Sequence, residues 1–469
     1  MKRALLAVLV GASSLLAATN FPFPQFNAYP FGIKAGGKLD DPKAVIQEKY
    51  EDWLSKYYGD CGDGRRARIK WVDIEKGNAE GTLTVSEGIG YGMLILVYMD
   101  NATNNTRAKF DKLWNYYNSF LDGNGLMKWK INGCNNALDD GAATDAEMDV
   151  ALALIMASKQ WGDDPYKADA LALLKKIWDK EVDHGNKLLK PGDLWADPYN
   201  PSYFATGALR VFAQFDTDAT HKWNDVADAC LNLIEKNAHP TTGLNSDWCS
   251  SGGNSVDKNG SGTGKFGYDA VRTPWRFTLD YLWFGTAKAK TQAAKITSWI
   301  RNTTSSFPSR IRMEYSQDGT PSQANPNVLY MGALVIPGMV DAANKTWVDN
   351  GEMEIASTSG AENYYGASWQ LLYQLTLAGN LLNPMKPSGV IGLDGRRIPL
   401  SWKAGVHQNT IRVELDAPGV VDLVDASGRM LGSARGGEIL ELEVPARKGI
   451  YFVVAQTATE RAVMPVVGN

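Results

Sequence analysis

Apolar residues recur at helical spacing in one segment after another between residues 40 and 380, and this repetition constrains the fold more than any other feature. Four stripes are clearly periodic: Ile46, Tyr50, Trp53, Leu54 and Tyr57; Phe110, Leu113, Trp114, Tyr117 and Leu121; Leu171, Leu174, Ile177 and Trp178; and Val226, Cys230, Leu233 and Ile234. Further helices are expected near residues 86–100, 145–160, 202–215, 268–286, 289–303, 326–343 and 364–378. About eleven helices predict a large, mainly α domain.

The pattern changes near Asn383, where short runs typical of β-strands replace the helical stripes. These runs are residues 411–415, 420–424, 440–444 and 450–454. A chain of 469 residues also exceeds the usual size of one core. We therefore expect a helical domain over residues 20–385 and a small all-β, sandwich-like module over residues 386–469.

Residues 1–19 have a basic start, a short apolar run and a small-residue end, which predicts a signal peptide too short to span a membrane. No later stretch is long and apolar enough for a transmembrane helix. The mature protein is therefore expected to be soluble and exported, either secreted or at the cell surface, and we assume a monomer.

The composition favours a neutral substrate. A formal net charge of −4 argues against nucleic acids and anionic polymers, which bind basic surfaces. The chain has 15 Trp and 19 Tyr, whose rings stack well on the flat apolar faces of sugars, although a Trp-rich core would account for most of them.

Four cysteines in an exported chain suggest disulfides, and their spacings match no zinc pattern. Three connectivities are possible, of which we favour Cys61–Cys134 with Cys230–Cys249. The four histidines are scattered, so we expect no metal and no cofactor.

Glu87 is the first candidate for chemistry, at the start of an expected helix. It could instead complete a capping box with Thr84 and merely satisfy a backbone N–H. Gly88, Gly90 and Gly92 follow it, and glycine in a helix is less favourable than alanine by up to about 1 kcal/mol. These glycines predict the close approach of another group, such as a large ligand.

Asp145 is the second candidate. On its own it would be interpreted as the N-cap of the following helix. Glu147 and Asp149 come directly after it, and three acids in five residues exceed what capping requires. They could equally form a solvated face.

Asp269 is the third candidate. It could be no more than a surface partner of Arg272 at i,i+3. However, Tyr268 precedes it and a segment dense in stacking and hydrogen-bonding groups, residues 273–276, follows. An Asp kept ionised by a neighbouring Arg is a good general base that could orient water.

Together these stretches resemble glycoside hydrolase family 8 over roughly residues 30–380. The matching blocks are residues 86–93 (Ser-Glu-Gly-x-x-Tyr-Gly-Met), 143–151 (Ala-Thr-Asp-Ala-Glu-x-x-Val-Ala, continuing to Trp161) and 268–276 (Tyr-Asp-Ala-x-Arg-x-Pro-Trp-Arg). Two positions depart from the family pattern, since Glu147 stands where Asp is usual and Val150 where Ile or Met is usual.

The resemblance implies an (α/α)6 barrel that hydrolyses β-1,4-glycans with inversion. Glu87 would be the general acid and Asp269 the base that activates water, with the two groups about 6.5–9.5 Å apart. Asp145 would hold the distorted sugar at the cleavage point, while Tyr268 and Arg272 would position the water.

Aromatic residues beside long polar loops are the expected sugar platforms. Trp129 and Trp195 come first, followed by Tyr203 and Tyr365, and Arg276 completes the expected substrate-binding set. Any one of these Trp residues is about as often part of the core as it is a sugar platform.

The expected activity is that of an endo-β-1,4-glucanase, a cellulase acting on cellulose or mixed-linkage glucan. A xylanase of the same family stays open, whereas an Asp at position 269 speaks against the chitosan-cleaving branch. A polysaccharide lyase is disfavoured by the scarce histidines and acidic charge. Intact acid and base residues also disfavour a non-catalytic glycan-binding protein.

The C-terminal module resembles the sorting domains of type IX secretion, on the strength of residues 425–429 and 448–452. The resemblance implies export machinery as a partner. The alternative is a generic β appendage that stabilises or spaces the enzyme.

Overall fold

The computed structural model describes residues 19–73, 78–162, 164–262, 264–386, 403–407, 410–425, 430–443, 449–457 and 461–468. This part of the chain contains twelve α-helices. They are α1 (Pro42–Tyr57), α2 (Ser86–Tyr98), α3 (Arg107–Ser119), α4 (Thr144–Gln160), α5 (Asp164–Glu181), α6 (Thr206–Phe215), α7 (Trp223–Asn237), α8 (Thr273–Phe284), α9 (Ala287–Thr303), α10 (Val328–Val335), α11 (Lys345–Ser357) and α12 (Tyr364–Leu377).

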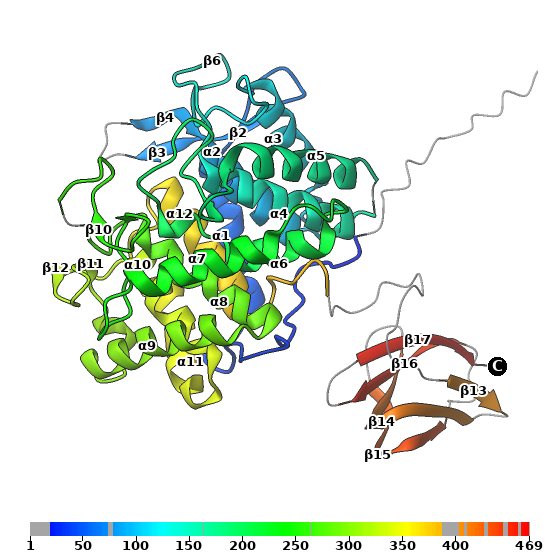
Figure 1. The fold of residues 1–469 in the computed structure, drawn as a ribbon. Coiled ribbons are helices and arrows are strands. Elements are labelled where there is room, and N and C mark those ends of the chain that lie inside the picture. The colour runs from blue at the N-terminus through cyan, green and yellow to red at the C-terminus, as the bar shows by residue number, and fades with distance from the viewer. Residues whose placement is uncertain are drawn as a thin grey trace, which may run out of the picture.

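The helices pack together in one body (Figure 1), and their contacts arrange them in two concentric rings. Each even-numbered helix contacts the next one, and α12 contacts α2, which closes an inner ring. The odd-numbered helices lie outside it, with α3 on α2, α5 on α4, α7 on α6, α9 on α8, α11 on α10 and α1 on α12. The helical domain is therefore an (α/α)6 barrel, as expected.

Inner and outer helices differ in sequence because they differ in burial. In α2 every residue except Glu87 is buried, since an inner helix has neighbours on all sides. In α1 only Ile46, Tyr50, Trp53 and Tyr57 are buried, which is one stripe facing the inner ring.

The structure corrects the expected helices at two places. Helix α11 was not predicted, because its buried face includes Gly351 and Glu352 beside Trp347 and Ile355 and so lacks a continuous apolar stripe. The helix expected over 326–343 is interrupted: α10 ends at Val335, and a 3-10 helix containing Pro337 follows. Proline has no N–H to continue the α-helical bonding.

Short strands in the loops between the helices were also not predicted. They are β1 (Tyr58–Asp60), β2 (Ala67–Ile69), β3 (Trp71–Asp73), β4 (Asn78–Val85), β5 (Lys130–Asn132), β6 (Asn136–Ala137), β7 (Val182–Asp183), β8 (Leu188–Leu189), β9 (Trp248–Cys249), β10 (Ser255–Val256), β11 (Met313–Tyr315) and β12 (Pro321–Gln323). Strands β3 to β6 form an antiparallel sheet in sequence order, with Val85 opposite Lys130. Because β4 runs directly into α2, this sheet fixes the start of the helix at Ser86 and so the position of Glu87 in its first turn.

The described C-terminal residues form one antiparallel sheet of five strands. They are β13 (Lys403–His407), β14 (Thr410–Asp425), β15 (Met430–Glu443), β16 (Gly449–Thr457) and β17 (Arg461–Gly468). The order is β13-β14-β16-β17, with β15 also paired to β14. Residues 426–429 and 448, which belong to the motifs similar to sorting domains, lie outside the described residues.

The N-terminal segment was expected to be a signal peptide, and residues 1–18 of it lie outside the described part of the chain. In the described part, each helix is too short or too polar to cross a bilayer.

One of the two predicted disulfides is present in the structure. Cys61 and Cys134 form a disulfide, as predicted, but Cys230 and Cys249 are free and buried. Cys230 lies on the inward face of α7 near the backbone of Leu189, whereas two backbone hydrogen bonds tie Cys249 to Tyr199. The two cysteines are therefore packed in different places and do not pair. Burial raises the pKa of both thiols to about 12.

We expect two free thiols in the denatured, unreduced protein and four after reduction. The Cys61–Cys134 bond joins residues 73 apart in sequence, so it restricts the unfolded chain strongly. Replacing both by Ser should lower the free energy of unfolding by about 2–4 kcal/mol. Thiol titration and chemical denaturation measure the two effects, and four thiols without reduction would contradict the pairing.

The acids on α4 are buried rather than solvated. Glu147 is 0% exposed, and its Oε1 accepts hydrogen bonds from the Tyr117 hydroxyl (3.2 Å) and the Met127 N–H (3.3 Å). Its Oε2 has no partner. Burial, and then the negative charge of the buried Glu181, raise the pKa of Glu147 well above its usual range near 4.5. The folded state therefore favours the neutral acid.

Glu147→Gln should make stability less dependent on pH. A raised folded-state pKa means that the stability contribution of the neutral acid is complete at about pH 4 and is lost as pH rises. The Gln variant should therefore match the parent at pH 4 and melt a few degrees higher at pH 8. Thermal unfolding at both pH values tests this, with the exposed Glu48→Gln as control, and a difference that does not grow with pH contradicts it.

Candidate active site

The candidate residues gather at one end of the barrel, at the N-termini of inner helices. Glu87 lies in the first turn of α2 and Asp145 in the first turn of α4. Asp269 immediately precedes a 3-10 turn (Ala270–Arg272) that leads into α8. Helix N-termini favour negative charge, so several helices support carboxylates at this end.

Arg272 joins the three carboxylates. Its Nη1 donates to Glu87 Oε2 (3.0 Å) and Asp145 Oδ2 (2.6 Å), and its Nη2 donates to Asp269 Oδ1 (2.8 Å). The Arg272 side chain is only 1% exposed. The interpretation of Asp269 and Arg272 as a plain surface pair is therefore wrong, because this guanidinium is the buried centre of the cluster.

Glu87 does not act as a cap. Helix α2 begins at Ser86 without a side-chain cap, and the Thr84 hydroxyl donates to the Ile69 carbonyl instead. The Glu87 carboxylate accepts hydrogen bonds from the hydroxyls of Tyr364 and Tyr91 as well as from Arg272. About a quarter of the side chain, 24%, is exposed, so it is accessible to a ligand.

The glycines after Glu87 serve helix packing. A Cβ on Gly90 would lie 2.9 Å from the Asp149 Cβ on α4, and one on Gly92 would lie 2.8 Å from Ile69. A Cβ on Gly88 would lie 3.3 Å from the Tyr364 ring. The predicted close approach is real, but protein groups make it, so the ligand interpretation of these glycines is corrected.

Asp145 is also not an N-cap, because α4 begins at Thr144 with Ala143 before it. Its side chain is buried against Arg272. Burial raises the pKa of Asp145 to about 7, although the positive charge of Arg272 opposes the shift.

Asp269 is more open to solvent, with 36% of its side chain exposed. The neighbouring Tyr268 is also exposed, and its carbonyl accepts a hydrogen bond from the Tyr365 hydroxyl (2.7 Å). Tyr203 lies beneath Arg272, with the guanidinium carbon 5.2 Å from its ring centre. Asp269, Tyr268, Tyr365 and Tyr203, like Glu87 and Asp145, thus contact this guanidinium or one of its immediate neighbours.

The structure places Arg276 elsewhere. It is buried, and its Nη1 and Nη2 bind the two carboxylate oxygens of Asp149. Its guanidinium also packs on the rings of Trp275 and Trp369. Arg276 therefore supports the barrel behind the site and does not face a ligand.

Aromatic rings lead from the cluster to the surface. Tyr203 lies beside Trp248 with ring centres 6.2 Å apart, and Trp195 stacks on Trp248 at 4.8 Å. Trp195 is 40% exposed, so its ring is available to a sugar. Trp129 is half-buried, and the ammonium of Lys130 lies 5.5 Å from its ring centre.

Three residues at the site were not predicted. Tyr364 precedes the predicted Tyr365 and bonds to Glu87, and Trp248 supports the exposed Trp195. Asp247 accepts three backbone N–H bonds from the segment that carries Asp269. The only sequence signal for Asp247 and Trp248 was their position in a long polar loop.

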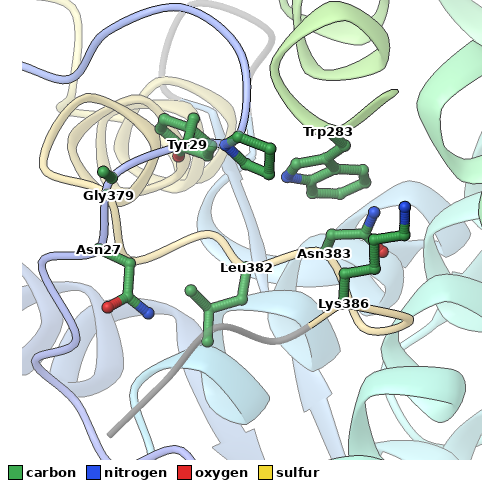
Figure 2. A pocket seen from close by; sticks show the side chains of 9 residues that line it. Asn27, Tyr29, Trp283, Gly379, Leu382, Asn383 and Lys386 are labelled. Atoms are coloured by element: carbon green, nitrogen blue, oxygen red, sulfur yellow. The ribbon is translucent and has the colours of Figure 1, made fainter. Parts of the chain in front are cut away.

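The pocket in Figure 2 is separate from this cluster. It is lined by the N-terminal segment around Tyr29, by Trp283 at the end of α8 and by residues 379–386. It contains none of the predicted site residues.

Comparison with known proteins shows the family of the chain. The family described as glycosyl hydrolases family 8 matches residues 21–379. Endoglucanase 2 of Ruminiclostridium josui is 33% identical over 379 residues, covering 78% of each chain, and Endoglucanase A of Acetivibrio thermocellus is 33% identical over 81% of this chain and 78% of the relative. The apo structure of the beta-1,3-1,4-glucanase from Paenibacillus sp.X4 has a TM-score of 0.71 and 30% identity, covering 77% of this chain and 99% of that one. The chain therefore belongs to glycosyl hydrolases family 8.

Proposed function

We propose that the protein is an exported endo-acting hydrolase that cleaves β-1,4-glycosidic bonds of cellulose or mixed-linkage β-glucan with inversion. The observation that carries this is the binding of Glu87, Asp145 and Asp269 to one buried guanidinium, Arg272, at one end of the barrel. Similar proteins named as endoglucanases and as a beta-1,3-1,4-glucanase support the substrate class.

Glu87 and Asp269 would divide the proton transfers. Glu87 gives a proton to the glycosidic oxygen as the bond from that oxygen to the anomeric carbon breaks. Asp269, which is open to solvent, takes a proton from the water whose oxygen bonds to the anomeric carbon from the opposite face. The products are two shorter sugars. Asp269 then releases its proton to solvent and Glu87 takes one up, so each cleavage consumes one water molecule and restores both carboxyl groups.

The surroundings of Glu87 support this role. After it gives up its proton, its carboxylate accepts hydrogen bonds from Arg272 and from the hydroxyl of Tyr364. Charge-assisted bonds of this kind stabilise the negative charge as it develops. Asp145, bonded to the same guanidinium, would hold the sugar at the cleavage point.

The aromatic residues would provide sugar subsites. Trp195, supported by Trp248, offers an exposed ring, and Tyr203, Tyr365 and Trp129 would line the approach to the cleavage point. Tyr268 would help Arg272 to position the attacking water.

The proposal for export comes from the sequence. Residues 1–19 would direct export, the enzyme would act as a secreted or cell-surface monomer, and the C-terminal module would engage type IX export machinery. Mass measurement of the protein recovered outside the cells tests whether residues 1–19 and the C-terminal module are removed.

The anomeric configuration of the first products tests the reaction. Carboxymethyl cellulose, mixed-linkage glucan and xylan are digested side by side and followed by early-time NMR. We expect α-anomeric oligosaccharides, released chiefly from the two glucans. Initial β-anomers would contradict the role of Asp269, preferential attack on xylan would favour a xylanase, and no release from any of them would favour a binding protein.

Glu87→Gln and Asp269→Asn should each lower kcat on a soluble β-1,4-glucan on the order of 10³-fold, because each removes a proton transfer. Asp257→Asn, on the long loop before Asp269, is the control and should leave kcat unchanged. Near-normal kcat in either of the first two variants would reject its assigned role.

Arg272→Lys should lower kcat on the order of 10²-fold, because one ammonium cannot hold three carboxylates in the fork geometry of a guanidinium. Arg210→Lys is a matched control. Arg210 binds Asp280 (2.7 Å) and Asp228 (2.8 Å) and not the three carboxylates of the cluster, so this substitution should lower the melting temperature but change kcat less than twofold. Equal effects of both variants on kcat would mean that Arg272 has only a structural role.

A further inference from the structure

The segment that carries Asp269 is held by a single carboxylate. Oδ1 of Asp247 accepts hydrogen bonds from the backbone N–H groups of Gly267 (3.1 Å), Asp269 (3.0 Å) and Ala270 (2.7 Å). The N–H of Asp269 is one of these donors, so the acceptor oxygen fixes the backbone of that residue directly.

The packing around this carboxylate is close. A Cβ added to Gly267 would lie 2.3 Å from Oδ2 of Asp247, so only glycine permits the observed contact. The Asp247 backbone N–H also donates to the Lys265 carbonyl (2.8 Å). The backbone and the side chain of Asp247 thus both bind the segment of residues 265–270.

The support for Asp247 reaches back to a barrel helix. The N–H of the preceding residue, Ser246, donates to Asn237 Oδ1 (2.9 Å), and its hydroxyl donates to the Trp248 carbonyl (2.7 Å). Asn237 is the last residue of α7. The position of Asp247 is therefore tied to α7, a helix of the outer ring.

The contacts of Asp247 call for an acceptor oxygen more than for a charge. Burial, and then the negative charge of Asp269, raise the pKa of Asp247 to about 7. A carbonyl oxygen at the position of Oδ1 would accept the same three N–H bonds.

We propose that Asp247 is a positioning residue of the hydrolysis. By binding the N–H groups of Gly267, Asp269 and Ala270, it holds the Asp269 carboxylate against Arg272 and toward the attacking water. This inference rests on the proposed role of Asp269 as the base, and it assigns Asp247 no contact with substrate. Misplacement of a reacting group by about 1 Å can lower a rate about 10²-fold.

The test compares Asp247→Ala with Asp247→Asn on the soluble glucan. The Ala variant should lose on the order of 10²-fold in kcat with KM changed less than about twofold. The Asn variant keeps an acceptor oxygen and should retain kcat within about fivefold. Kcat of the Ala variant within threefold of the parent, or equal losses in both variants, would overturn the proposal.

A second pair of variants covers a failure of Asp247→Ala to fold. Gly267→Ala keeps the carboxylate but displaces it, and should lower kcat without raising KM. Gly252→Ala, on the same loop with no contact nearer than 3.7 Å, should be neutral. Asp257→Ala is a further control, because Asp257 Oδ1 accepts two backbone N–H bonds, from Asn259 and Ser261, that do not reach Asp269.

Hydrogen exchange separates this inference from the proposed function. The amides of Gly267, Asp269 and Ala270 should exchange faster in Asp247→Ala than in the parent and remain protected in Asp247→Asn. If Asp269→Asn proves active, the base assignment fails while the exchange result still tests the anchor. Unchanged exchange in Asp247→Ala would refute the anchoring itself.

Discussion

The guanidinium of Arg272 is a buried positive charge, and the arrangement of the site depends on it. An isolated charge at a position only 1% exposed would be strongly disfavoured, so anions have to surround it. Glu87, Asp145 and Asp269 supply them from three separate segments of the chain. Removing one partner of a buried pair costs about 3–5 kcal/mol, a large part of a typical stability of about 5–15 kcal/mol. Folding of the barrel and assembly of the site are therefore linked.

A second buried Arg–Asp pair, Arg276 with Asp149, lies one helical turn further along the same two helices. Arg272 is the residue before α8 and Arg276 follows four residues later in its first turn, just as Asp145 and Asp149 are four residues apart on α4. Residues four apart lie on one face of a helix, so two Arg–Asp pairs connect α8 to α4 one above the other. Both pairs are closed to solvent, and Arg272 binds two additional carboxylates, those of Glu87 and Asp269. Gly90 allows α2 to approach α4 closely enough for Glu87 to join them.

How much of the barrel the sequence predicts depends on how each helix is buried. The four clear stripes all belong to the outer helices α1, α3, α5 and α7, which have one buried and one exposed face. Inner helices are buried on almost all sides and include polar residues, so no single apolar stripe marks them. Helix α11 was missed because Gly351 and Glu352 lie on its buried face. In both cases the burial of a residue depends on which helix packs beside it, and the local sequence does not contain this information.

The site was predictable only where residue types carry the chemistry. Glu87, Asp145 and Asp269 stand out as acids in unusual contexts, but the first two are ambiguous in sequence because an acidic residue near a helix N-terminus is also typical of a cap. The contacts that decide between the interpretations are remote: Tyr364 is 277 residues from Glu87.

Asp247 marks the other limit of prediction from sequence. The groups it binds are backbone N–H groups, which nearly every residue has. The side chains of residues 267–270 therefore do not indicate that a carboxylate binds this segment. The one trace of the contact is Gly267, where a side chain would collide with the carboxylate. A glycine in a catalytic segment is thus as informative about the protein group that packs on it as about a ligand. The glycines after Glu87 illustrate the same point, since α4, Tyr364 and Ile69 fill the space they leave.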